Sequence, residues 1–147
     1  MTDRMTPGQR SWNMSRIRSK NTGPELRVRS IIHRMGFRFG LHSRELPGKP
    51  DIVLRRLKTV VWVHGCFWHR HSGCDQTTMP KSNVDVWRKK FLNNVARDAR
   101  TTKAIRALGW QPVIVWQCEL RNEQRLAAKL QKTLAKADRR SRRLASQ

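Results

Sequence analysis

Three short apolar runs, each bounded by turn or basic residues, most strongly limit the folds open to this chain. They read Asp51-Ile52-Val53-Leu54, Val60-Val61-Trp62-Val63 and Pro112-Val113-Ile114-Val115-Trp116. Runs of this length and composition are typical of buried β-strands. Because segments with helical spacing precede, separate and follow them, the pattern predicts an α/β domain: a central mixed β-sheet flanked by helices.

The helical segments have recognisable starts, ends or faces. Thr22 and Pro24 predict a helix start, and Gly36 predicts its end. A further strand is expected over residues 37–41, and a turn over residues 46–50. A long helix is expected over about residues 86–108, with one buried face. That face would carry Trp87, Phe91, Val95 and Ala99. A last helix would bury Leu126, Leu130 and Leu134.

The length of 147 residues suits one domain with a modest core. We expect a basic N-terminal arm over residues 1–20, a folded domain over 21–136 and a basic, disordered tail over 137–147, because the tail is mostly Arg and Ser.

Charge points to a polyanionic partner. Thirty-two Lys and Arg residues against ten Asp and Glu residues give a net charge of +22. Such an excess is typical of proteins that bind nucleic acid, although a ribosomal-type RNA binder would show it too. No apolar run reaches the roughly 18 residues of a membrane span, and the N-terminus lacks the apolar core of a signal peptide. We therefore expect no membrane partner and a reducing cytoplasm, in which the three cysteines are thiols or metal ligands.

A zinc site is predicted in the Cys- and His-rich loop that follows residue 65. Two thiols and an imidazole from this loop, with a remote thiol just after a strand, would make a tetrahedral Cys3His structural site. Its ligands would be Cys66, His71, Cys74 and Cys118. The spacing leaves His69 open as a replacement for His71. The alternative is that Cys66 and Cys118 are small buried hydrophobic residues without a metal.

Two acidic residues are candidates for a magnesium site. Asp51 opens a strand after a turn, and Glu25 lies in the first turn of the first helix. Carboxylate oxygens suit a hard cation that must be held against a phosphate. His64 and His69 lie at the end of the neighbouring strand, where an imidazole could take a proton from an attacking water. The alternatives are that Asp51 caps a turn, Glu25 favours a helix start and the two histidines belong to the zinc loop.

These residues, taken in order, resemble one known family. Val63-His64-Gly65-Cys66-Phe67-Trp68-His69, preceded by Leu46-Pro47-Gly48-Lys49-Pro50-Asp51, is similar to the very-short-patch-repair (Vsr) mismatch endonucleases. The resemblance extends from about residue 10 to residue 120. Its other motifs are Arg10-Ser11-x-Asn13-Met14, Pro24-Glu25-Leu26, Asn94-Val95-x-Arg97-Asp98, Gly109-Trp110 and Val115-Trp116-x-Cys118-Glu119-Leu120.

The resemblance implies a restriction-endonuclease-like fold with a zinc-stapled loop, which would make residues 21–136 the nuclease domain. It implies Mg²⁺-dependent nicking 5′ of the thymine in a T:G mispair, the product of 5-methylcytosine deamination, as the start of very short patch repair. The partner would be double-stranded DNA, bound by a monomer in a bacterial cytoplasm and at the nucleoid. The family usually works beside a cytosine methyltransferase and downstream mismatch-repair proteins.

Residue roles also follow from the resemblance. Asp51 would bind Mg²⁺ and His69 would be the general base, while Glu25 and His64 would support them. The four zinc ligands would be those given above. Many nucleases of this fold carry a carboxylate-x-Lys on the second strand, which is absent here, so the backbone carbonyl of Val63 would complete the Mg²⁺ site. Side chains inserted at the mismatch would be Phe67 and Trp68, with Trp87 and Met14 as further contacts.

Two other interpretations stay open from the sequence. A nickase that needs no mismatch would use the same residues on a specific sequence. A zinc-stabilised DNA-binding module without catalysis would keep the basic surface, with Asp51 and His69 incidental.

Overall fold

A computed structural model of the chain describes residues 21–146. Its elements, in chain order, are α2 (Gly23–Arg34), β1 (Gly40–Leu41), β2 (Ile52–Leu54), β3 (Thr59–His64), α3 (Val84–Ala107), β4 (Gln111–Trp116), the 3-10 helix η1 (Gln117–Arg121) and α4 (Glu123–Ala145). The expected arm over residues 1–20 lies outside the described residues.

The strands form one mixed sheet in the order β1-β2-β3-β4. β2 is antiparallel to both β1 and β3, whereas β3 and β4 are parallel, with His64 opposite Trp116. The long helix α3 makes the crossover between the two parallel strands, as a parallel connection requires. The predicted mixed sheet flanked by helices is therefore confirmed.

Helix α2 begins where its sequence predicts. The Thr22 hydroxyl accepts a hydrogen bond from the Glu25 backbone N–H (3.4 Å), Pro24 occupies the first turn, and Gly36 follows the helix with a φ of +86°. These local signals fix the start of α2, and with it the place of Glu25 in the first turn.

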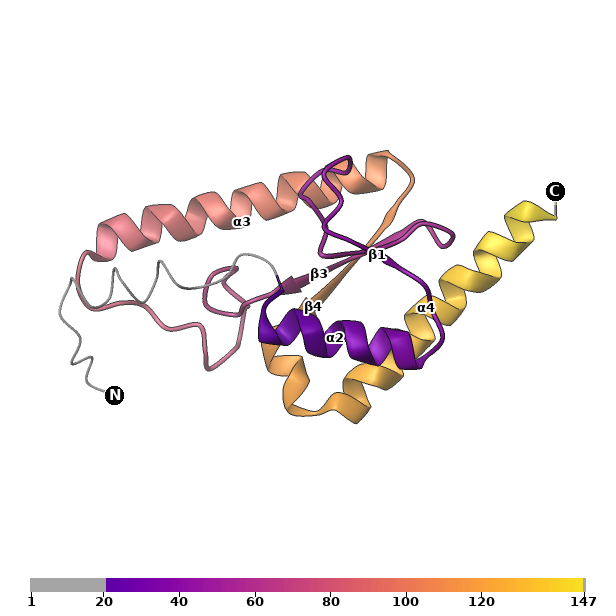
Figure 1. Cartoon of the computed structure of the whole chain (residues 1–147). Coiled ribbons are helices and arrows are strands. Elements are labelled where there is room, and N and C mark those ends of the chain that lie inside the picture. The colour runs from indigo at the N-terminus through magenta and orange to yellow at the C-terminus, as the bar shows by residue number, and fades with distance from the viewer. Residues whose placement is uncertain (1–20, 147) are drawn as a thin grey trace.

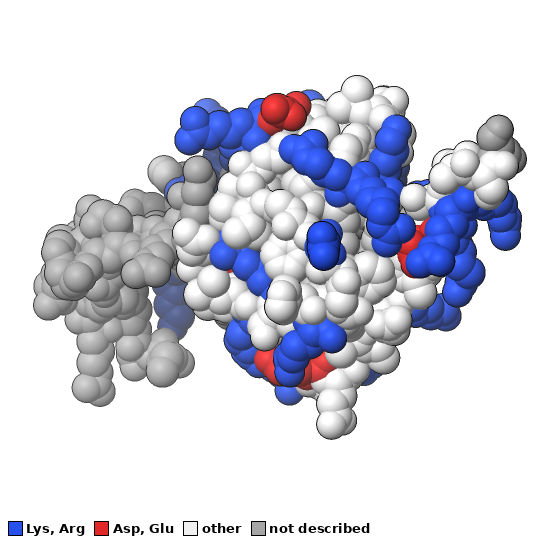
Figure 2. Space-filling model, turned by 45° about the vertical axis from the view of Figure 1, so that its right-hand side comes forward, with Lys and Arg blue, Asp and Glu red and all other residues white. Residues whose placement is uncertain are grey.

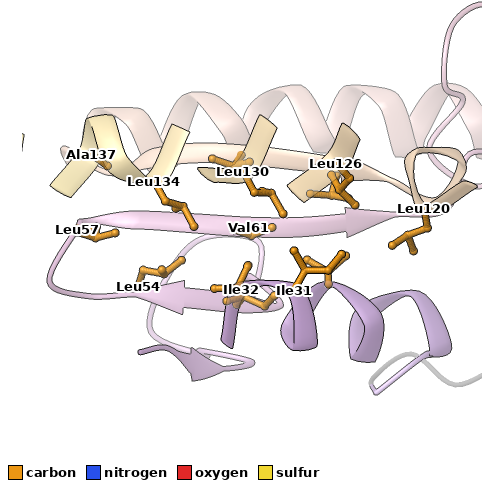
Figure 3. Close-up of a cluster of buried hydrophobic side chains, with 14 residues drawn as sticks. Ile31, Ile32, Leu54, Leu57, Val61, Leu120, Leu126, Leu130, Leu134 and Ala137 are labelled. Carbon is orange, nitrogen blue, oxygen red and sulfur yellow. The ribbon is translucent and has the colours of Figure 1, made fainter. Parts of the chain in front are cut away.

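Helices cover both faces of the sheet. On one face, α2 and α4 pack their aliphatic side chains on those of β2, β3 and β4 (Figures 1 and 3). On the other face, Ile105 of α3 packs with Val53, Val60 and Trp62. Coverage of both faces explains why β2 and most of β3 are buried at successive positions, rather than at alternate ones.

Two predicted segments differ from the structure at their edges. The strand expected over residues 37–41 is reduced to Gly40–Leu41, because Phe37 and Phe39 pack against the core before the ladder begins. Of the expected buried face of α3, Phe91 is buried, but Val95 is 45% exposed and Ala99 is also exposed.

The prediction of a disordered tail over residues 137–147 is wrong for residues 137–145, which continue α4 (Figure 1). Contacts with the β2–β3 turn explain the difference. Arg56 pairs with Asp138 (2.6 Å), and the Ser141 hydroxyl donates to the Arg56 carbonyl (2.8 Å). Ala137 still belongs to the buried face of the helix. Within residues 21–146, no helix is long and apolar enough to cross a membrane.

Candidate functional site

A cavity of about 740 Å³ lies where α2, the turn before β2, the end of β3 and the middle of α3 meet. Its lining includes all four residues predicted to be catalytic. These are Glu25, Asp51, His64 and His69. The fold therefore brings together side chains that are up to 44 positions apart in the sequence.

Asp51 immediately precedes β2, and its Oδ2 atom accepts a hydrogen bond from the backbone N–H of Val63 on β3 (2.7 Å). The pKa of Asp51 is raised to about 6, mainly by burial and in part by the nearby Glu25 carboxylate, against the opposite effects of the Val63 N–H and Arg29. Such a carboxylate is costly to ionise alone, and a bound cation would favour its charged form.

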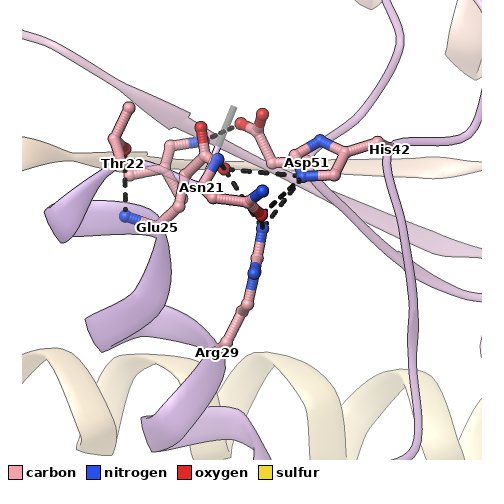
Figure 4. A network of polar contacts seen from close by, with 7 residues as sticks. Asn21, Thr22, Glu25, Arg29, His42 and Asp51 are labelled. Atoms are coloured by element: carbon pink, nitrogen blue, oxygen red, sulfur yellow. Dashed lines mark hydrogen bonds and ion pairs between the residues drawn. The ribbon is translucent and has the colours of Figure 1, made fainter. Parts of the chain in front are cut away.

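Glu25 and Asp51 share their corner of the cavity with His42 (Figure 4). The candidate ligand atoms of these three residues lie within 4.8 Å of one another. Glu25 is only 3% exposed, and its carboxylate lies 3.3 Å from Arg29. Sequence analysis missed His42 and Arg29, because one histidine after a strand and one arginine among many carry no distinguishing signal.

A second cluster joins the end of β3 to α3. The imidazoles of His64 and His69 stack with centroids 3.8 Å apart and planes inclined by 6°. His69 Nδ1 lies 2.7 Å from Asp98 Oδ2. The pKa of His64 is lowered to about 4, mainly by burial and in part by the neighbouring His69. Asp98 was present in a motif of the resemblance, but only the structure places it beside His69.

The four predicted zinc ligands converge at the end of the parallel strand pair. Cys66, His71, Cys74 and Cys118 place their candidate ligand atoms within 4.8 Å of one another. Cys118, in η1, approaches His71 with an Sγ–Nδ1 distance of 3.4 Å. Burial and the neighbouring thiols of Cys66 and Cys74 raise the pKa of Cys118 to about 12. The geometry favours His71 over His69 as the fourth ligand, because His69 is directed to Asp98.

The aromatic side chains expected at the mismatch form one cluster beside the cavity. Phe67 packs edge-on against Trp68 (5.1 Å between ring centroids) and Phe91 (5.1 Å), and Trp87 lies 5.9 Å from Trp68. The Lys90 ammonium lies over Trp68 and Trp87. The side chains of Phe67, Trp68 and Trp87 are half-buried. They are more exposed than core residues, but less exposed than expected for residues of an insertion loop. Met14 lies outside the described residues.

Basic side chains lie on the surface of the protein and in the large cavity. Lys and Arg are spread over the face shown in Figure 2, with few Asp and Glu among them. Arg97 and Lys49 line the large cavity itself. A cavity with acidic residues inside and basic residues at its edge suits a substrate with a phosphate backbone and a bound cation.

The fold is also that of a solved nuclease domain. The catalytic domain of the homing endonuclease I-Bth0305I is similar over 80% of this chain and 98% of that chain, with a TM-score of 0.56 and 19% sequence identity. This likeness concerns the fold alone, and it agrees with the expected restriction-endonuclease-like architecture.

Comparison with known sequences defines the class of protein: an endonuclease, which hydrolyses DNA. The family model described as DNA mismatch endonuclease Vsr matches residues 2–76. The Vsr mismatch endonuclease of Escherichia coli is 36% identical over 86% of this chain and 80% of that protein. The type II nicking enzyme V.XorIIP of Xanthomonas oryzae pv. oryzae is 49% identical over 91% of this chain and 98% of that protein. The chain belongs to the Vsr family of DNA mismatch endonucleases.

Proposed function

We propose that this endonuclease nicks one strand of duplex DNA 5′ of the thymine in a T:G mispair, by Mg²⁺-dependent hydrolysis, and so starts very short patch repair. One observation carries the proposal: a pair of buried carboxylates and a carboxylate-paired histidine line the same cavity. The protein would act as a monomer on DNA in a bacterial cytoplasm, at the nucleoid, ahead of downstream mismatch-repair proteins.

Asp51 and Glu25 would hold Mg²⁺, Asp51 directly and Glu25 through a water. The donor set fits this cation, because both side chains offer oxygen and both are mostly buried. The backbone carbonyl of Val63 would supply a further oxygen. Mg²⁺ would neutralise charge on the phosphate. The Val63 N–H, which holds Asp51, keeps this carboxylate fixed at the end of β3.

His69 would be the general base. An Asp98 carboxylate 2.7 Å from Nδ1 accepts the Nδ1–H, which leaves the Nε2 lone pair free to take a proton from water. His64 stacks on the same ring, and its low pKa keeps it neutral near pH 7. A neutral neighbour spares His69 the repulsion of a second positive charge while it holds the proton.

Zinc would staple the loop after β3 to η1 through Cys66, His71, Cys74 and Cys118. The donor set fits zinc: three thiols and an imidazole have converged, and at least one thiol is costly to ionise without a cation. This site would be structural. It would fix the loop that carries Phe67, Trp68 and His69.

Phe67, Trp68 and Trp87 would contact the bases at the mispair, with Met14. Unstacking one step costs a few kcal/mol, and a mispaired step costs less. Their half-buried cluster, anchored where the Asn94 amide donates to the Trp68 carbonyl (3.2 Å), is a firm support for such insertion.

A second candidate function is nicking at a specific sequence without a mispair. It is favoured by relatives named as type II nicking enzymes, one of them from Neisseria meningitidis and 44% identical. Family membership as a nuclease argues against the non-catalytic DNA-binding module.

The test is strand nicking on end-labelled duplexes that differ only in one T:G pair, with varied flanking bases and with or without Mg²⁺. Asp51→Asn serves as the inactive variant. We expect a Mg²⁺-dependent nick 5′ of the mispaired T that is absent in Asp51→Asn. Equal nicking of the fully paired duplex would replace the mismatch proposal by the second candidate. Binding without nicking of any duplex would contradict both.

A further inference from the structure

The carboxylate of Glu25 is held from one side only. Its hydrogen-bond donors within residues 21–146 all reach Oε2: the Asn21 backbone N–H at 3.0 Å and Arg29 Nη2 at 3.3 Å (Figure 4). His42 Nε2 lies near the same oxygen, at 3.8 Å. Among the residues that the structure describes, the other oxygen, Oε1, therefore has no polar partner. The carboxylate is nearly buried, so the direction in which it is held decides what it can reach.

Arg29 is the centre of this arrangement. Besides Glu25, its Nη2 atom contacts Asn21 Oδ1 (2.7 Å) and His42 Nε2 (2.9 Å). A guanidinium can only donate hydrogen bonds, so His42 Nε2 must be the acceptor in this pair. The lone pair of Nε2 is directed at Arg29, which makes His42 a support for the arginine rather than a metal ligand.

A backbone hydrogen bond ties His42 to Asp51, the residue that carries the other carboxylate. The His42 N–H donates to the Asp51 carbonyl (3.3 Å), just beyond the β1–β2 ladder. Arg29 lies one turn after Glu25 on α2, and its side chain is 13% exposed. Arg29, nearly buried, thus offsets part of the negative charge of Glu25 and Asp51. Through His42, it also connects the helix that carries Glu25 with the strand edge that carries Asp51.

We propose that Arg29 is a positioning residue that holds Glu25 through Oε2 and keeps Oε1 free for the Mg²⁺ site, and that His42 supports Arg29. The inference rests on the proposed Mg²⁺ site of Asp51 and Glu25, and it assigns to that site two residues that sequence analysis missed. Loss of a group that orients a metal ligand typically weakens metal binding about 10- to 100-fold.

The experiment measures metal binding directly, by electron paramagnetic resonance with Mn²⁺ as the probe on the zinc-loaded protein. Asp51→Asn identifies the signal of this site. Arg29→Met is expected to weaken Mn²⁺ binding about tenfold or more, and Arg29→Lys, which keeps the charge, to recover part of it. Arg34→Met removes the same charge from an exposed position of the same helix and should bind like the wild type.

A second pair of variants covers the case in which Arg29→Met does not fold. His42→Gln keeps an acceptor for Arg29 and should bind Mn²⁺ more tightly than His42→Leu, which has none. In nicking assays of the Arg29 and His42 variants, the Mg²⁺ concentration that gives half-maximal rate should rise by the same factor as the Mn²⁺ dissociation constant. Wild-type Mn²⁺ affinity in both Arg29→Met and His42→Leu would overturn the inference while leaving the proposed function intact. A wild type that neither binds Mn²⁺ nor nicks would overturn both.

Discussion

Asp51 is less stable as a charged group in this fold than it is in water. Burial raises its pKa to about 6, so the folded protein holds the carboxyl proton more tightly than the unfolded chain, whose value is 3.8. The cost of ionisation is therefore absent below about pH 4, grows as the pH rises from 4 to 6, and is fully present above pH 6.

Asp51→Asn should accordingly stabilise the protein at neutral pH, by about 1–3 kcal/mol in Mg²⁺-free buffer, because the amide carries no charge and can still accept from the Val63 N–H. The gain should vanish near pH 4. Urea unfolding of both proteins at neutral pH and near pH 4 measures this difference in the free energy of unfolding. Glu45→Gln, at a position 82% exposed, is the control and should show little change. A stability gain of equal size at both pH values would contradict the assigned cause.

Asp98 offers a second test at this scale. Asp98→Asn can present an N–H to Nδ1 of His69 and so favour the tautomer that carries the proton on Nε2, which cannot act as a base. We expect the nicking rate at saturating enzyme to fall about 10²-fold or more, with DNA affinity unchanged. A single-turnover nicking assay, paired with a binding titration, measures both. Nicking at the wild-type rate would exclude Asp98 as the partner that sets the His69 tautomer.

Among the elements, the loop between β3 and α3 divides its two histidines between two sites. His71 lies with the three cysteines, and His69 with Asp98. His71→Ala should lose the bound zinc, about one per chain, and lower the melting temperature. His69→Ala should keep the zinc but lose nicking. Metal analysis of the two purified variants measures their zinc content. Loss of zinc in His69→Ala alone would reverse the assignment.

The predictability of these elements from sequence follows from how local their signals are. The start of α2 was predictable because Thr22, Pro24 and Glu25 act within one turn. The end of α4 was not, because the ordered segment depends on the pairing of Asp138 with Arg56, 82 residues away. The same limit applies to the site. Residue types and the family resemblance pointed to Asp51 and His69, but the contacts of Arg29, His42 and Asp98 exist only once α2, α3 and the sheet have packed.

For the molecule as a whole, the net charge of +22 should govern its affinity for DNA. If about six phosphates are neutralised, the association constant should fall about 10³-fold between about 50 and about 200 mM salt. Fluorescence anisotropy of a labelled duplex measures the slope. The single-turnover nicking rate of the bound complex should change far less, because salt poorly screens the buried Glu25 and His64 and the partly buried Asp51, His69 and Asp98. A flat salt dependence of binding would contradict this role of the basic surface.

The parallel pairing of β3 with β4 also sets an order of assembly. Glu25, Asp51, His69 and Asp98 all precede β4 in the chain, whereas Cys118 follows it. A ribosome that has already synthesised all the acids and histidines of the cavity has not yet made the last thiol of the Cys and His cluster. That cluster can close only after β4 has joined the sheet and α3 has been laid across it. Closure of the metal site would then mark the end of folding, and a nascent nuclease would gain its rigid loop only when the whole domain is in place.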